Sequence, residues 1–225
     1  MILLDYVWKT PQLIDTLKRI ESRKLAAYFP TASKTRALRI GLESESLDSA
    51  FPHYQAVSNL FVALSLLEVF TLRLARLALE DSKEPVSAKG QGLQRSLNTL
   101  SKLGVSTSRQ ELWPQVNAAL KIRHCQMHAG GLLNESRDAG ALRQIVRTKA
   151  FLQAAHRKSV SNAEAYVVVT SSQHGDQLRI SNEYSWIATA YARDYFLALC
   201  VEVQTRLASH RLPTPRNGEA STAAV

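Results

Sequence analysis

The chain has 225 residues and carries 28 lysines and arginines against 19 aspartates and glutamates, a formal net charge of +9. Its hydrophobic fraction of 45% is enough for a folded core, and the basic excess favours an acidic polymer as partner. The two cysteines, Cys125 and Cys200, exclude a disulfide framework and a Cys-x-x-Cys zinc site, so we expect buried free thiols in a reducing compartment.

The predicted elements are mainly helical. Apolar residues at helical spacing and flanking prolines or glycines predict one long helix and several shorter ones, with residues 31–50 as a partly helical connector. Ser108 is the expected cap of the fourth helix, which Gly130-Gly131 ends. The expected helices cover residues 10–29, 52–81, 93–103, about 108–129 and 137–158.

After residue 158 the spacing of apolar residues changes from a helical period to the alternation of a strand. Residues 166–170 and 178–181, around a His174-Gly175-Asp176 turn, predict a β-hairpin, and Ser181 or Asn182 then caps a last long helix to about Leu207. The expected fold is therefore a helical bundle with a small β-hairpin before the last helix. We divide it into an N-terminal helical extension (1–50), a helical domain (51–210) and a disordered tail (211–225).

Two features bear on localisation. The first five residues lack a positive region and a long apolar stretch, so they do not predict a signal peptide. The apolar segment 57–79 is interrupted by Glu68, Arg73 and Arg76, which favours a buried helix over a membrane span. We expect a cytoplasmic protein without a membrane partner.

The segment Arg123-His124-Cys125-Gln126-Met127-His128 carries the strongest functional signal. A guanidinium grips phosphoryl oxygens in a bidentate manner, and an imidazole exchanges a proton near neutral pH. On a regular helix Arg123 and His128 lie roughly 140° apart, so we expect them to share a cleft only if the long arginine side chain reaches round the helix or if the helix ends at His128, as Gly130-Gly131 suggests. One such pair supplies one proton-transfer group, and a symmetric dimer would supply two.

This segment resembles the signature of the HEPN superfamily, an arginine and a histidine separated by four to six residues. His124 fills the position after the arginine, where asparagine is usual in the family. The resemblance extends over residues 51–207 through Leu66-Leu67-Glu68, Gly90-Gln91-Gly92-Leu93, Leu100-Ser101-Lys102-Leu103-Gly104, Trp113 and the hairpin before the last helix. The first fifty residues match nothing in it.

The resemblance implies a homodimeric, metal-independent endoribonuclease without a cofactor, which leaves a cyclic phosphate and a 5′-hydroxyl. Such enzymes commonly act as toxins or in phage defence, so a cognate antitoxin or a sensor protein is an implied partner beside the RNA substrate. Carried over by position, Arg123 and His128 are catalytic, and His124 and Glu68 support them.

Other interpretations of the same residues stay open. Glu68 can pair with Arg73 or Arg76 and only stabilise packing. His124 and His128 have zinc-ligand spacing, although no third ligand is evident in the sequence. The alternative function is a non-catalytic HEPN-like module that binds RNA or a protein. If an RNA groove exists, its phosphate contacts are expected from the basic residues Arg143, Arg147, Lys149, Arg157 and Lys158.

Overall fold

The computed structural model describes residues 2–29, 34–82 and 89–211. In this part of the chain the protein is mainly helical, with one two-stranded antiparallel sheet before the last long helix, which confirms the predicted fold class. The elements are α1 (Ile2–Tyr28), α2 (Lys34–Glu45), a π-helical turn (Ser46–Ala50), α3 (Phe51–Ser82), α4 (Gly92–Lys102), α5 (Trp113–Ala129), a 3-10 turn (Leu133–Glu135), α6 (Ala139–Thr148), α7 (Ala154–Ser159), a 3-10 turn (Ala163–Ala165), β1 (Val167–Ser172), β2 (Gly175–Ile180) and α8 (Asn182–Arg211).

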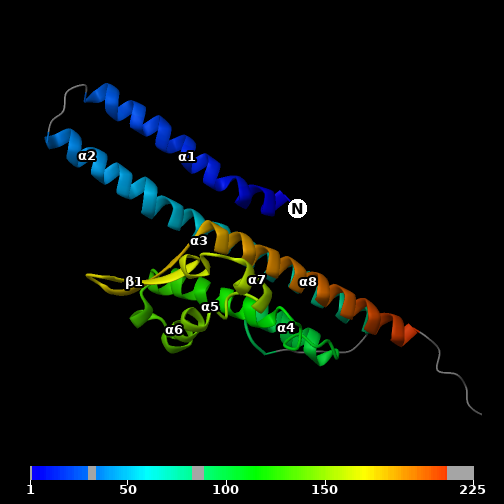
Figure 1. The fold of residues 1–225 in the computed structure, drawn as a ribbon. Coiled ribbons are helices and arrows are strands. Elements are labelled where there is room, and N and C mark those ends of the chain that lie inside the picture. Colours follow the sequence, from blue (N-terminus) through cyan, green and yellow to red (C-terminus); the bar gives the residue numbers. More distant parts are fainter. Residues whose placement is uncertain (1, 30–33, 83–88, 212–225) are drawn as a thin grey trace, which may run out of the picture.

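The two longest helices, α3 and α8, pack against each other along the length of the bundle. Figure 1 shows α4, α5 and α6 on one side of this pair and α1 on the other. Buried side chains of both helices, among them Leu60 and Leu64 from α3 and Tyr195 and Leu199 from α8, form the centre of the core. Burying such side chains is the main favourable term in folding, so this pair is the frame on which α4 and α5 rest.

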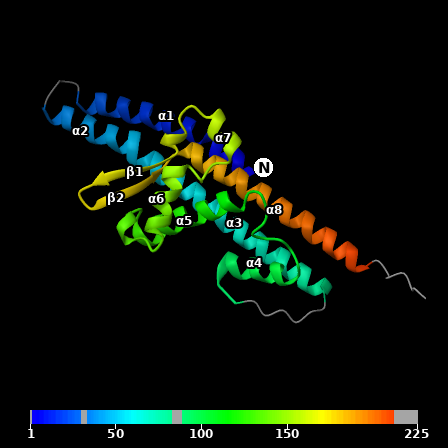
Figure 2. The same ribbon diagram turned by 60° about the horizontal axis from the view of Figure 1, so that its bottom comes forward.

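The N-terminal end of α1 lies against this frame, and the rest of α1 extends beyond the bundle beside α2 (Figure 2). The prediction for this region was too short: α1 begins at Ile2, not near Thr10, and Pro11 lies inside it. Proline costs a helix one hydrogen bond, a cost that the packing of α1 against α8 and α3 offsets.

The expected connector, residues 31–50, is helical wherever the structure describes it. Helix α2 continues through the π-helical turn into α3, and Glu45 and Phe51 at the two ends of that turn keep right-handed helical backbone angles. The predicted domain boundary at residue 50 therefore falls inside a continuous helical run. Residues 212–225 of the predicted tail lie outside the described residues, and Arg211 is the last residue of α8.

Helix α4 starts one residue before the expected position and ends as the sequence predicted. Gly104 follows its last turn with φ of +84°, and the N–H groups of Gly104 and Val105 donate to the carbonyls of Ser101 and Leu100. This is the Schellman pattern that a glycine after a helix makes possible. The prediction for the next helix was wrong at its start, because residues 106–112 form turns and α5 begins at Trp113 with Pro114 in its first turn.

The basic stretch 137–158 is two helices, not one. Lys149 adopts a left-handed conformation with φ of +53° and ends α6, and this turn carries Phe151 and Leu152 into the core. Burial of these two side chains outweighs continued helix formation, and α7 begins again at Ala154.

The hairpin is confirmed, with its turn displaced by one residue from the expected position. Ser172 pairs with Gly175, so the loop is Gln173-His174, and Gly175 takes φ of +110°. After β2, the Ser181 hydroxyl accepts a hydrogen bond from the Tyr184 N–H at 3.3 Å and begins α8, as expected. No helix among the described residues is long and apolar enough to cross a membrane.

Candidate functional site

Helix α5 carries Arg123, His124 and His128 across the bundle. One face of it, with Val116, Ala119 and Ile122, is buried against the core. The segment that leads into it is fixed to α8, where the Glu202 carboxylate accepts hydrogen bonds from the Ser106 N–H at 2.8 Å and the Gln110 amide at 2.6 Å. The position of the three site residues is therefore determined by the buried face of α5 and by the contacts of the segment before it with α8.

The guanidinium of Arg123 is enclosed, with its side chain 13% exposed. Its Nη1 lies 3.8 Å from Glu68 Oε2, and its Cζ lies 5.9 Å from the centre of the Phe61 ring, both on α3. Its Nη2 lies 3.5 Å from His124 Nε2, and its buried Nε has no hydrogen-bond partner in the described structure. A buried N–H without an acceptor is energetically costly, so the surroundings of Arg123 leave one of its polar groups unsatisfied.

Glu68 belongs to this site, and the structure decides which arginine it meets. The two arginines considered from the sequence as partners, Arg73 and Arg76, form no ion pair with Glu68 among the described residues, and the Cζ of Arg73 lies instead 5.9 Å from the centre of the Phe70 ring. The Glu68 carboxylate, on α3, faces Arg123. An ion pair across two helices fixes the direction of a long arginine side chain, and this pair is only partly exposed.

Gly92, the first residue of α4, determines how close Glu68 comes to that helix. Its φ is +55°, and a Cβ atom built on it would lie 2.7 Å from Glu68 Oε1. A side chain at this position would push the carboxylate away, and the left-handed backbone disfavours one in any case. Sequence reasoning used Gly92 only as part of a family pattern and missed this contact, because nothing in the sequence shows that α4 begins beside Glu68.

His124 lies between Arg123 and His128. The rings of His124 and His128 are four residues apart on one helix face, with centres 6.0 Å apart. The contacts among the described residues therefore run from Arg123 to His124 and from His124 to His128. Helix α5 stays regular through Ala129, so Arg123 and His128 point in different directions from it, and the shared cleft of the two predicted catalytic residues stays a prediction.

The two histidines differ in their surroundings. His124 is half-buried, and this burial, followed by the nearby charge of Arg123, lowers its pKa below the usual value. His124 is therefore neutral at pH 7, and in the tautomer with the proton on Nδ1 its Nε2 accepts from Arg123. His128 is exposed to solvent in the last turn of α5.

The end of α5 is attached to the hairpin. The Gln126 amide donates to the Leu178 carbonyl at 2.7 Å, and the Leu178 N–H donates to the Gly131 carbonyl at 2.8 Å. Gly130 takes φ of +57° as the helix ends, which confirms the predicted Gly-Gly stop. These contacts fix the turn that carries His128.

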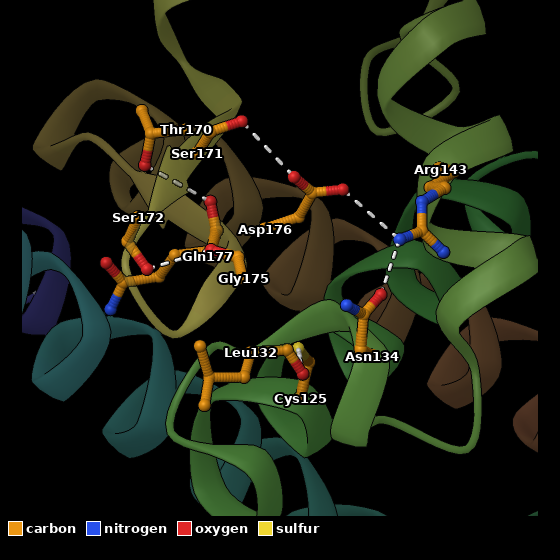
Figure 3. A network of polar contacts seen from close by, with 10 residues as sticks. All are labelled: Cys125, Leu132, Asn134, Arg143, Thr170, Ser171, Ser172, Gly175, Asp176 and Gln177. Atoms are coloured by element: carbon orange, nitrogen blue, oxygen red, sulfur yellow. Dashed lines mark hydrogen bonds and ion pairs between the residues drawn. The ribbon is translucent and has the colours of Figure 1, made fainter.

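Three of the five basic residues predicted to contact phosphate already have partners on other elements of the chain. Arg143 on α6 points toward Asp176 of the hairpin and Asn134, as Figure 3 shows, at distances of 3.3 and 2.8 Å. Lys149 pairs with Glu164 at 2.7 Å, and Arg157 donates to the Thr148 carbonyl at 3.0 Å.

The other two basic residues, Arg147 and Lys158, are exposed on α6 and α7, and Arg147 contacts Gln144 on its own helix. Four of the five lie on α6 or α7 and Lys149 directly follows α6, whereas α3 and α5 hold the Arg123 guanidinium. As for the zinc interpretation of His124 and His128, the described residues contain no group of three or more histidine, cysteine, aspartate or glutamate side chains able to hold a metal ion.

Comparisons of the chain with protein-family models, with curated proteins and with solved structures returned no match.

Proposed function

We propose that this protein is a metal-independent endoribonuclease that cuts RNA by attack of the ribose 2′-hydroxyl on the adjacent phosphate. One observation carries the proposal: a guanidinium fixed by Glu68 and Phe61 lies on the same helix as two neighbouring imidazoles, one neutral and half-buried and the other exposed. The resemblance of the Arg123–His128 segment to the HEPN signature supports the same chemistry.

In the proposed reaction Arg123 binds the scissile phosphate. Its guanidinium compensates the negative charge that develops on the phosphoryl oxygens. Because the guanidinium is already held in place, little reorganisation is needed when the substrate binds.

His128 transfers the proton. Its exposed ring is accessible to a ribose 2′-hydroxyl or to the leaving 5′-oxygen, and such a transfer typically contributes ~10²–10⁴-fold to the rate. His124 accepts from Arg123 and acts as a positioning residue. A second copy of the chain would supply the second proton-transfer group, and a homodimer is therefore part of the proposal.

The experiment compares wild type with His128→Ala on total tRNA and a long RNA in EDTA, followed by end-group analysis. His174→Ala, in the exposed hairpin loop, is the matched control. We expect wild type and the control to leave a cyclic phosphate and a 5′-hydroxyl, and His128→Ala to lose at least 100-fold in rate, about the lower bound for such a transfer. An EDTA-resistant His128→Ala protein of full activity contradicts the assignment, as does unchanged cleavage by Arg123→Ala.

The second candidate function is a non-catalytic module that binds RNA or a protein. It is favoured by the ion pair of Arg123 with Glu68 and by the small exposed fraction of the arginine, both of which suit a structural role. Salt-sensitive RNA binding without turnover on any substrate supports this candidate. Growth arrest on expression of wild type, absent for His128→Ala, supports the nuclease as a toxin or defence effector with an antitoxin or sensor as partner.

A further inference from the structure

A groove between α3 and α4 adjoins the Arg123 site. Its volume is about 390 Å³, within the range of small-ligand sites. The residues that matter to its chemistry are Glu68, Arg76, Gly92, Arg95, Ser96 and Thr99. Glu68 belongs to both places, since its carboxylate lines the groove and lies 3.8 Å from Arg123.

Among the described residues, the groove carries a positive charge without a counter-ion. The guanidinium groups of Arg76 and Arg95 are exposed, and neither forms an ion pair with a described residue. The one carboxylate among the described lining residues, Glu68, is already paired with Arg123. Two unpaired arginines facing one concave surface attract an anion more strongly than the same charges dispersed over a convex one.

Ser96 adds an independent observation. Its side chain lines the groove and is only 2% exposed, yet its buried Oγ has no hydrogen-bond partner in the described structure. Thr99, one turn further along α4, has its hydroxyl satisfied by the Arg95 carbonyl at 3.0 Å. A serine in a helix can make the same bond to its own backbone, so a buried, unpaired hydroxyl on a residue that lines a basic groove indicates a missing acceptor.

We propose that this groove binds a phosphate of the RNA strand next to the scissile phosphate, with Arg76, Arg95 and Ser96 as its donors. Arginine and serine side chains are typical phosphate ligands in protein–nucleic acid interfaces. The shared residue Glu68 places the groove directly beside Arg123, as neighbouring phosphates of one strand require. The assignment of the phosphate to RNA rests on the proposed function.

The test measures binding of an uncleavable 2′-O-methyl oligoribonucleotide by fluorescence anisotropy over a range of salt concentrations. The variants are Arg76→Gln, Arg95→Gln, the double variant and Ser96→Ala. Arg73→Gln is the matched control, because Arg73 lies on α3, carries the same charge and stacks over Phe70 outside the groove lining.

We expect each groove arginine variant to raise Kd roughly tenfold and to reduce the slope of log K against log salt by about 0.7. Ser96→Ala removes a neutral donor, so Kd should rise several-fold at an unchanged salt slope. Wild-type affinity and slope in the double variant overturn the proposal, and so does an equal loss in Arg73→Gln, because the effect would then be one of net charge only.

Competition by inorganic phosphate and by AMP distinguishes a phosphate of the RNA strand from that of a free nucleotide. If inorganic phosphate or AMP displaces the oligonucleotide at the concentrations at which it saturates the groove, the occupant of the groove is a phosphate of the strand. Arginine-dependent binding of AMP that leaves RNA affinity unchanged overturns the strand assignment in favour of a free nucleotide. Since the probe cannot be cut, loss of binding in the groove variants supports the groove even if no RNA is ever cleaved, and only the nuclease proposal then fails.

Discussion

Replacing Gly92 with alanine tests the arrangement that holds Glu68 against Arg123. The backbone of Gly92 is left-handed, which costs a residue with a Cβ about 1–2 kcal/mol. The added Cβ would lie 2.7 Å from Glu68 Oε1, so the carboxylate has to move and the partly exposed ion pair with Arg123, worth about 0.2–1 kcal/mol, is weakened. The total is about 2 kcal/mol of unfolding free energy, or a melting temperature lower by roughly 4–8 °C.

The assay is thermal and urea unfolding of four proteins: wild type, Gly92→Ala, Glu68→Ala and the double variant. If the carboxylate contact contributes as the distance indicates, alanine at position 92 costs less in the Glu68→Ala background, and only the backbone penalty remains. Gly41→Ala is the matched control, since Gly41 lies inside α2 with nothing within 4 Å of its Cβ position, and we expect it to gain about 0.5–1 kcal/mol.

Full stability of Gly92→Ala would refute this reasoning. An equal cost with and without Glu68 would show that only the backbone matters and that the carboxylate is not constrained by α4. The same variant also bears on function, because a displaced Glu68 no longer fixes the Arg123 guanidinium. We therefore expect weaker RNA binding by Gly92→Ala and unchanged binding by Gly41→Ala.

Two further predictions concern stability. Ser96→Ala removes a buried hydroxyl without a partner, so the ligand-free protein should gain about 1 kcal/mol and melt roughly 2–4 °C higher; a lower melting temperature would mean that the hydroxyl is satisfied in solution. The pKa values of His53 and His124 are lowered, in both cases chiefly by burial, so below about pH 6.5 the unfolded chain binds protons that the folded protein does not. Unfolding free energy measured by urea titration should therefore fall from pH 7 to pH 5, and it should fall less steeply in His124→Asn. The same pH dependence in that variant as in wild type would contradict a lowered pKa of His124 in the folded protein.

The histidine at position 53 shows how local pattern and tertiary contact differ. Its place at the start of α3 was evident, but its buried contact with the backbone of Ile180, at 3.3–3.4 Å from Nδ1 to N and O, joins residues that are 127 positions apart. The same holds for Arg123 and Glu68. The spacing of apolar residues placed Glu68 and Arg123 on two different helices, whereas their ion pair depends on how α3 and α5 pack.

The sequence by itself determined the mainly helical class, the hairpin and where α4 and α5 end, because apolar spacing and glycine act over a few residues. It also brought together His124 and His128, since four residues on a helix fix their separation. Only the tertiary structure decided which arginine Glu68 meets, where α5 begins, and that α3 and α4 enclose a basic groove beside Arg123. Such contacts join residues far apart along the chain, and their geometry follows from the packing of whole helices, which no local pattern specifies.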